Sequence, residues 1–326
     1  MSASSPRTTR RLRAGESLGL LVVLAVLVLV FGLLGRNFLT ASTFQQIANQ
    51  VPALTVIAVG MTFVILTSGI DLSVGSVMAA SGAILGLAMS GDKFPLLLAL
   101  PLAMVTGGVC GFANGWVTVR FRVPSFIVTL GMMQIARGLA YLATDSETLY
   151  IGARVEWLNS PIKGIGLSPA IILAVLLVVV AQIVLRRSVF GRHVLVIGAN
   201  EEAAVYSGIS TSPLRVAVFV IAGTLAGLAS AFESSKMGAV DPNGGIGIEL
   251  SAIAAVVVGG TSLMGGRGSV TGSFLGVLII ATLGAGLANL GASEPVKLLV
   301  TGLVIVLAVI ADAWRHGGSR KSSHNP

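Results

Sequence analysis

Long apolar runs separated by short polar segments organise this chain. Ten runs approach the length of about 20 apolar residues that a transmembrane helix needs. They cover roughly residues 16–35, 44–67, 72–90, 95–119, 124–143, 167–185, 213–232, 249–264, 269–290 and 295–312. The pattern predicts an all-α polytopic membrane protein with about ten transmembrane helices, of which the eighth is short and rich in glycine at its end.

The composition also indicates a membrane protein. Of the 326 residues, 54% are hydrophobic and 10% are charged, whereas soluble domains carry about 25% charged residues. The net charge of +8 does not indicate nucleic-acid binding, because the basic residues lie at the ends of apolar runs and are not clustered with aromatic residues. The single cysteine, Cys110, excludes an intrachain disulfide.

The basic residues predict the orientation. An even number of spans puts both ends on one side, and with both ends in the cytoplasm fourteen of the 21 lysines and arginines lie inside. Arg137 falls within a span, and the outside residues are Arg36, Lys93, Arg154, Lys163, Lys236 and Lys297. This excess predicts an N-in/C-in topology. We expect cytoplasmic tails at 1–15 and 313–326 around a transmembrane domain at 16–312, with a cytoplasmic loop at 186–213 and an outer loop at 144–166.

Three pairs of short sequences recur in the same order. The pairs are GIDLS (69–73) with GIELS (247–251), VTGG (105–108) with VTGS (270–273), and VPSFIVTLG (123–131) with EPVKLLVTG (294–302). The offset corresponds to five spans, an odd number, so matching helices run in opposite directions. We interpret spans 2–5 and 7–10 as an inverted repeat, an arrangement that many transporters use.

Two acids stand at the centre of the first pair, Asp71 before Ser73 and Glu249 before Ser251. One reading is local: an acid at a helix start accepts hydrogen bonds from free backbone N–H groups and suits the positive end of the helix dipole. The other reading is that the acids line a polar path, since intramembrane acids are usually functional. Counting spans places them toward opposite faces of the membrane, which argues against a shared ion-coupling site.

Four further polar residues lie inside predicted spans: Asn114, Gln134, Arg137 and Asn289. Gln134 and Arg137 are three positions apart and share one helix face. These side chains either fix the packing of helices through hydrogen bonds or line a path for a polyhydroxylated solute. The sequence leaves both alternatives open.

The cytoplasmic loop contains EEAAVYSGI (201–209), which predicts a short helix. Asn200 is its expected cap, Glu201 and Glu202 stand in its first turn, and Gly208 ends it. Its small apolar face favours docking to a partner over a solvated connector. The outer loop carries Asp145, Glu147 and Glu156.

Several motifs are absent from the sequence. There is no GxxxxGK[ST], so the chain is not expected to bind or hydrolyse ATP itself. There is no CxxC, HExxH or GxSxG either, so neither a metal site, nor a catalytic set, nor a cofactor is predicted. These absences weigh against a membrane-bound enzyme.

Four segments together resemble the bacterial ABC-importer permeases for monosaccharides, of the ribose permease type. They are GIDLSVGSVMA, VPSFIVTLGMMQIARGLAYL, GRHVLVIGANEEAAVYSGI and IELSAIAAVVVGGTSLMGGRGSVTGSFLGVLI, and the likeness runs from about residue 44 to residue 312. The chain departs from the family at VLVIGAN and at Val205-Tyr206.

The resemblance implies a multi-pass protein of the bacterial inner membrane. Its partners would be a second permease chain (a homodimer is expected), two ATPase subunits and a periplasmic sugar-binding protein that meets the outer loop. The residues of the implied ATPase-coupling helix are Glu201, Glu202, Ala203, Ala204, Ser207 and Gly208. The cargo would be ribose or a similar sugar. The alternatives are another small solute, such as an amino acid, a nucleoside or a signalling sugar, or a secondary transporter that works alone.

Overall fold

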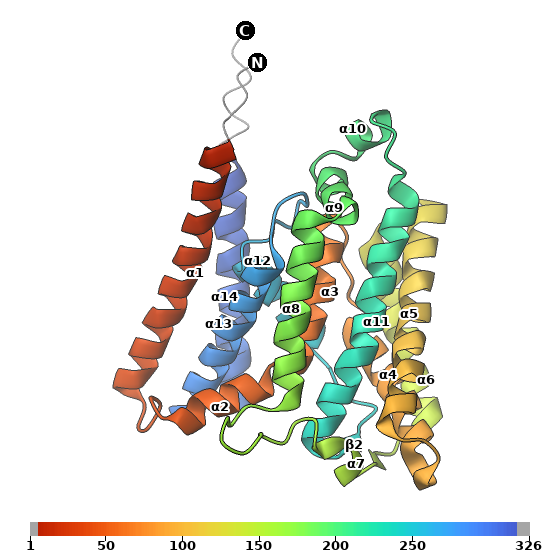
Figure 1. Cartoon of the computed structure of the whole chain (residues 1–326), viewed down its shortest axis with the longest axis vertical. Helices are drawn as coiled ribbons and strands as arrows, with labels where there is room; N and C mark the ends of the chain where they lie inside the picture. The colour runs from red at the N-terminus through yellow and green to blue at the C-terminus, as the bar shows by residue number, and fades with distance from the viewer. Residues whose placement is uncertain (1–5, 318–326) are drawn as a thin grey trace.

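The computed structural model describes residues 6–317, and nearly all of its regular structure is helical (Figure 1). The predicted tails therefore lie partly outside the described residues. The helices are α1 (Pro6–Leu34), α2 (Ala41–Gln50), α3 (Pro52–Leu66), α4 (Val74–Met89), α5 (Leu96–Phe121), α6 (Ser125–Thr144), α7 (Ala153–Glu156), α8 (Pro169–Arg187), α9 (Val189–Ala199), α10 (Glu201–Tyr206), α11 (Thr211–Met237), α12 (Ile248–Val258), α13 (Val270–Asn289) and α14 (Glu294–Gly317), with a single 3-10 turn at Ser90–Asp92.

The helix ends divide the molecule into two poles. The start of α1 and the end of α14 lie at the same pole as α9 and α10, at the top of Figure 1. The opposite pole carries α2, α7 and a two-stranded antiparallel sheet of β1 (Leu149–Tyr150) and β2 (Ala239–Val240). In the sheet, Leu149 pairs with Val240, so the predicted outer loop is tied to the segment that precedes α12.

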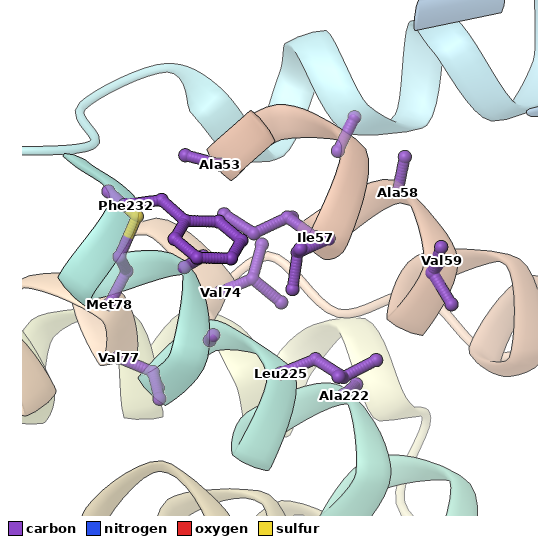
Figure 2. Close-up of a cluster of buried hydrophobic side chains, with 14 of the residues drawn as sticks. Ala53, Ile57, Ala58, Val59, Val74, Val77, Met78, Ala222, Leu225 and Phe232 are labelled. Carbon is purple, nitrogen blue, oxygen red and sulfur yellow. The ribbon is translucent and has the colours of Figure 1, made fainter. Parts of the chain in front are cut away.

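Helix α3 forms the centre of the core. All of its residues except Leu54 are buried, and α11, α12, α13 and α8 pack around it. Figure 2 shows Ile57 of α3 with Val74 and Met78 of α4 and Phe232 of α11 in one cluster. Within a membrane such packing stabilises the fold mainly through van der Waals contact, because lipid tails are as apolar as the side chains.

Helices α5 and α11 pack closely along their length, and glycine makes this approach possible. A methyl group on Gly107 would collide with the carbonyl of Gly223, and one on Gly223 would collide with the carbonyl of Gly107. Gly111 meets the backbone of Phe219 in the same way. Glycines spaced four apart, Gly107 with Gly111 on α5 and Gly223 with Gly227 on α11, let the two backbones approach this closely.

The helices fall where the apolar runs predicted them, but not all are continuous spans. Five described helices are long and apolar enough to cross a membrane: α5, α6, α8, α11 and α13. A sixth crossing is the pair α2 and α3, which is bent by 49°. The break lies at Pro52, which lacks an N–H group and so cannot continue the hydrogen bonding of α2.

The third and eighth predicted spans are shorter than expected. Helix α4 has 16 residues and α12 has 11, which correspond to about 24 Å and about 17 Å, less than the roughly 30 Å hydrocarbon layer. Each follows a non-helical segment, residues 67–73 before α4 and 241–247 before α12. Both segments fall mostly between predicted spans, but the hydrophobic pattern did not reveal how far they shorten the helices that follow them.

The loop at 186–213, predicted to be cytoplasmic, is more ordered than expected. Besides α10, it contains α9, which the sequence interpretation treated as loop. The side chain of Ser188 caps α9 by accepting a hydrogen bond from the N–H of Gly191 (3.0 Å). This serine was the local signal for a helix start that could have revealed α9.

Candidate functional site

The non-helical segment 67–73 is held by side chains of α6. The N–H of Ile70 donates to Ser125 Oγ (2.9 Å), and the N–H of Leu72 donates to Thr129 Oγ1 (3.1 Å). A backbone that leaves a helix inside a membrane needs such partners, because lipid offers none. The hydroxyls of α6 therefore make the interruption before α4 possible.

Asp71, Ser73 and Asn114 form one buried cluster beside this segment. Each is 1% exposed. Asp71 Oδ1 accepts hydrogen bonds from the N–H (2.9 Å) and the hydroxyl (2.6 Å) of Ser73, and Asn114 Nδ2 donates to Ser73 Oγ (2.9 Å). The acid thus makes the local contacts predicted for a residue at a helix start, and Asn114 extends them to α5.

Glu249 makes a comparable local contact at the start of α12. Its Oε1 accepts from the N–H of Gly247 (3.2 Å), while Ser251 Oγ donates to the carbonyl of Gly247 (3.1 Å). Gly247 has φ of 82°, a conformation that glycine adopts easily and that starts the helix sharply.

The two acidic motifs lie close together. A methyl group on Gly75, in the first turn of α4, would collide with the carboxylate of Glu249 and the carbonyl of Gly245. Gly75 is four residues after Asp71, so the starts of α4 and α12 meet inside the protein. Asp71 and Glu249 thus both stand where a short helix begins in the interior of the protein, not at the end of a full-length span.

Arg137 on α6 holds the second non-helical segment. Its Nη1 donates to the carbonyl oxygens of Pro242 and Gly244, the latter at 3.0 Å. One turn further along α6, Tyr141 Oη and Asn243 Oδ1 form a hydrogen bond of 2.7 Å. Tyr141 and Asn243 were missed by the sequence analysis, because nothing in the sequence pairs residues 102 positions apart.

The other two polar candidates do not join this region. Gln134 lies on α6 but is exposed. Asn289 is exposed at the end of α13, where its amide oxygen lies against Gly35. The interior site therefore consists of Asp71, Ser73 and Asn114 on one side and Arg137, Glu249 and Ser251 on the other.

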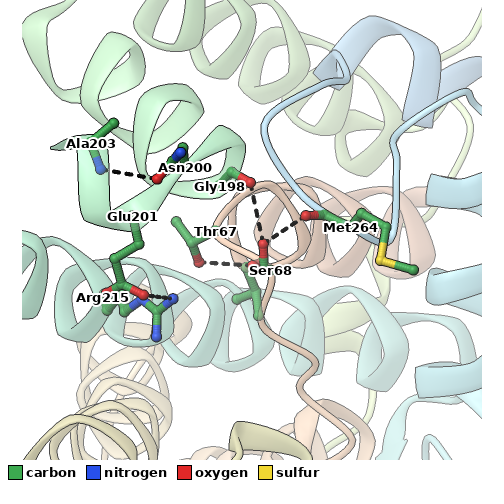
Figure 3. Close-up of polar contacts among 9 residues, drawn as sticks. Thr67, Ser68, Gly198, Asn200, Glu201, Ala203, Arg215 and Met264 are labelled. Atoms are coloured by element: carbon green, nitrogen blue, oxygen red, sulfur yellow. Dashed lines mark hydrogen bonds and ion pairs between the residues drawn. The ribbon is translucent and has the colours of Figure 1, made fainter. Parts of the chain in front are cut away.

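The helix predicted within the loop at 186–213 is confirmed as α10. Asn200 Oδ1 accepts from the N–H of Ala203 (2.9 Å), and Gly208 follows the helix with φ of 78°. The helix is tied to α11 by an ion pair between Glu201 Oε2 and Arg215 Nη2 (2.7 Å; Figure 3).

The candidate residues of α10 divide into two groups. Ala204 is fully buried and anchors the helix to its own protein. Glu202, Ala203, Val205, Tyr206, Ser207 and Gly208 are exposed, and Tyr206 is 90% exposed. Glu201 belongs to neither group: its side chain pairs with Arg215 but is 42% exposed, so it is accessible to a partner together with the second group.

A chain of contacts joins α9 and α10 to the interior site. Ser68 Oγ donates to the carbonyl of Met264 (2.8 Å) and lies 3.5 Å from the carbonyl of Gly198 at the end of α9 (Figure 3). The N–H of Gly266 donates to the carbonyl of Leu66 (2.9 Å). Residue 68 is three positions before Asp71, so a displacement of α9 acts almost directly on the segment that carries the acid.

No group of three or more His, Cys, Asp or Glu side chains within residues 6–317 is arranged to hold a metal ion. The site is thus built from hydroxyls, amides, two acids and one guanidinium. Their hydrogen bonds are made with one another and with the backbone of the two non-helical segments.

Comparisons with known proteins identify the family of this chain. A sequence model described as "Branched-chain amino acid transport system / permease component" matches residues 43–309. Ribose import permease protein RbsC of Bacillus subtilis is 39% identical over 307 residues, which cover 91% of this chain and 92% of that protein. RbsC of Haemophilus influenzae is 36% identical over 297 residues (90% and 92%). Fructose import permease protein FrcC of Rhizobium meliloti is 35% identical over 303 residues (90% and 84%). Since these matches cover almost the whole set of membrane helices, the chain belongs to the branched-chain amino acid transport system permease family.

Proposed function

We propose that this chain is the pore-forming subunit of an ATP-driven importer and that it moves a monosaccharide, ribose or a close relative, across the inner membrane. The observation that supports the sugar is the match to ribose and fructose import permeases over nine tenths of the chain. ATP hydrolysis is assigned to separate ATPase subunits. The remaining partners are a periplasmic sugar-binding protein and a second copy of this chain.

The proposed topology is N-in/C-in. It is supported by the position of both described chain ends at one pole together with α9 and α10 (Figure 1). In this topology residues 16–312 form the transmembrane domain, the loop at 186–213 is cytoplasmic and the loop at 144–166 is periplasmic. In this arrangement α7, β1 and β2 face the periplasm and lie where the binding protein would dock.

The inverted repeat is supported by the two half-length helices. Helices α4 and α12 each follow a non-helical segment, each begins next to an acid, and their starts meet. Two halves of opposite orientation that meet at interrupted helices suit alternating access, in which one half rocks against the other around a central site.

The exposed surface of α10 is our proposed contact with the ATPase. When the ATPase subunits close, α10 would move, α9 would follow, and the Ser68 contacts would transmit the movement to residues 69–73. The acids then act as positioning groups for the interrupted helices, and Arg137 holds the segment before α12 on the opposite side of the site.

The topology is tested with two thiol variants. Tyr206 at α10 is 90% exposed and Tyr150 in β1 is 83% exposed, while the native Cys110 is buried. A thiol reagent that does not cross membranes should label Tyr150→Cys in intact cells and Tyr206→Cys only after the membrane is opened. Labelling of Tyr206→Cys from outside would contradict the orientation.

The function is tested by reconstitution. The chain and its co-purified partners are placed in liposomes with the binding protein outside, and uptake of labelled ribose, fructose and leucine is measured with and without internal ATP. We expect ATP-dependent uptake of a monosaccharide. Uptake of leucine alone would show instead that the solute is a branched-chain amino acid, as the description of the family states. Uptake driven by an ion gradient without ATP would indicate a secondary transporter.

A further inference from the structure

A cavity of about 580 Å³ lies beneath α10 and is separate from the interior site. Its walls are the end of α3 with residues 67–70, the turn between α5 and α6, the start of α11 and the side chain of Glu201. More than half of the lining residues carry a hydroxyl or a charge. Cavities of roughly 300–1,000 Å³ are typical of small-molecule sites.

The charges of this cavity favour an anion. Arg122 and Arg215 line it, against one acid, Glu201, which already pairs with Arg215. The start of the long helix α11 also faces the cavity through Thr211 and Ser212, and the preceding Ser210 makes no capping hydrogen bond. The free N–H groups and the dipole at such a helix start attract negative charge.

Two polar groups at the cavity have no partner among the described residues. Thr118, which is 8% exposed, belongs to the cavity wall, and its Oγ1 is buried and makes no hydrogen bond. Arg215 Nε is also buried without an acceptor, although Nη2 of the same side chain binds Glu201. Buried polar groups are normally paired, so these two atoms mark a part of the cavity wall whose hydrogen bonding is incomplete.

We propose that this cavity binds the phosphate monoester of a monosaccharide from the cytoplasmic side. The phosphate would accept hydrogen bonds from Arg122, Arg215 and the first N–H groups of α11, and the sugar hydroxyls would face the hydroxyl-bearing residues of the cavity wall. The inference rests on the proposed function for the solute class and for the cytoplasmic location. A neutral sugar gains no charge attraction from Arg122 and Arg215, whereas the phosphate of a sugar ester can form ion pairs with both.

Binding of the ester has a mechanical consequence. The phosphate competes with Glu201 for the Arg215 guanidinium, so α10 loses its tie to α11. Import would then slow when the ester accumulates in the cytoplasm. The reaction that supplies this ligand is the phosphorylation of the imported sugar by a kinase, which makes the cavity a site of feedback by the next reaction.

Direct binding tests the proposal without any need for transport. The full chain, with the subunits that accompany it, is placed in nanodiscs of neutral phosphatidylcholine and titrated by calorimetry with ribose 5-phosphate, ribose and inorganic phosphate. We expect the ester to bind, phosphate to bind more weakly, and ribose not to bind at the same concentrations. Equal binding of ribose and its phosphate, or no binding of the ester, overturns the inference while leaving the uptake experiment to judge the proposed function.

Nanodiscs that contain phosphatidylglycerol distinguish the source of the phosphate. We expect the same affinity for ribose 5-phosphate in these discs. If the anionic lipid abolishes ester binding, the cavity takes a lipid headgroup and the proposal is wrong.

Three variants assign the binding to the cavity. Arg122→Gln should weaken ester binding by about tenfold to a hundredfold, the effect of losing a charge-assisted hydrogen bond. Arg120→Gln, an exposed arginine on the same helix end that does not line the cavity, is the matched control and should change nothing. Glu201→Gln should tighten binding, because it frees Arg215. Equal effects of the Arg122 and Arg120 substitutions would contradict the assignment, as would weaker binding in Glu201→Gln.

Discussion

Ser73 should be the most sensitive residue of the buried cluster. It donates to Asp71 at 2.6 Å and accepts from Asn114 at 2.9 Å, with all three residues 1% exposed. Ser73→Ala removes both bonds and leaves a buried carboxylate and a buried amide short of partners. An unsatisfied buried group costs about 1–3 kcal/mol, and more when charged, so we expect a loss of roughly 2–4 kcal/mol in the free energy of unfolding.

Asn114→Ala should cost less than Ser73→Ala. It removes one hydrogen bond, worth about 0.5–1.5 kcal/mol, but also removes the buried Asn114 Oδ1, which has no partner among the described residues. Because both substitutions break the same bond, the double variant should lose roughly 0.5–1 kcal/mol less than the sum of the single losses.

The assay is unfolding in mixed micelles of mild detergent and sodium dodecyl sulfate, followed by far-ultraviolet circular dichroism. Asn289→Ala is the matched control, because Asn289 is exposed at the end of α13, and its loss should stay within about 0.5 kcal/mol. If Ser73→Ala is no more destabilising than this control, or if the two cluster substitutions are additive, the cluster does not hold the start of α4.

Three further predictions concern the neighbouring elements. Gly75→Ala should destabilise the protein by about 1–3 kcal/mol, because the new methyl group meets the Glu249 carboxylate, whereas Gly131→Ala, with open space around it, should be neutral or slightly stabilising in the same unfolding assay. Arg137→Gln should reduce the rate of ATP-dependent uptake more than Arg137→Lys, since lysine still donates to backbone carbonyls. Equal rates in both variants and the native chain would refute the role of Arg137 in holding the segment before α12. Glu202→Lys should leave stability within about 0.5 kcal/mol of native and lower solute-stimulated ATP hydrolysis, and unchanged stimulation would remove Glu202 from the contact surface.

Local signals in the sequence predicted much of this architecture. The apolar runs located the long helices, because a run of about 20 apolar residues has the length of a transmembrane helix. Helix α10 followed from the cap at Asn200 and the glycine at 208, both of which act within a few residues. The same kind of signal, Ser188, was present for α9 but was obscured by the expectation of a loop.

Contacts between distant segments were not available from the sequence. The meeting of Gly75 with Glu249 and the ion pair of Glu201 with Arg215 depend on how helices pack. The support of the segment before α4 was not available for a related reason: its backbone is held by Ser125 and Thr129 of α6, which lie more than 50 positions away in the sequence.

The contact between α10 and an ATPase tests the account most directly. Tyr206→Cys and, as a control at the opposite pole, Tyr150→Cys are expressed in the native host, treated with a membrane-permeant thiol cross-linker, and the products are identified by mass spectrometry. We predict that Tyr206→Cys is joined to a subunit with a P-loop nucleotide site and that Tyr150→Cys is not. A chain that purifies alone, gives no such product at Tyr206→Cys, and still drives solute uptake in ATP-free liposomes under an ion gradient would contradict the account.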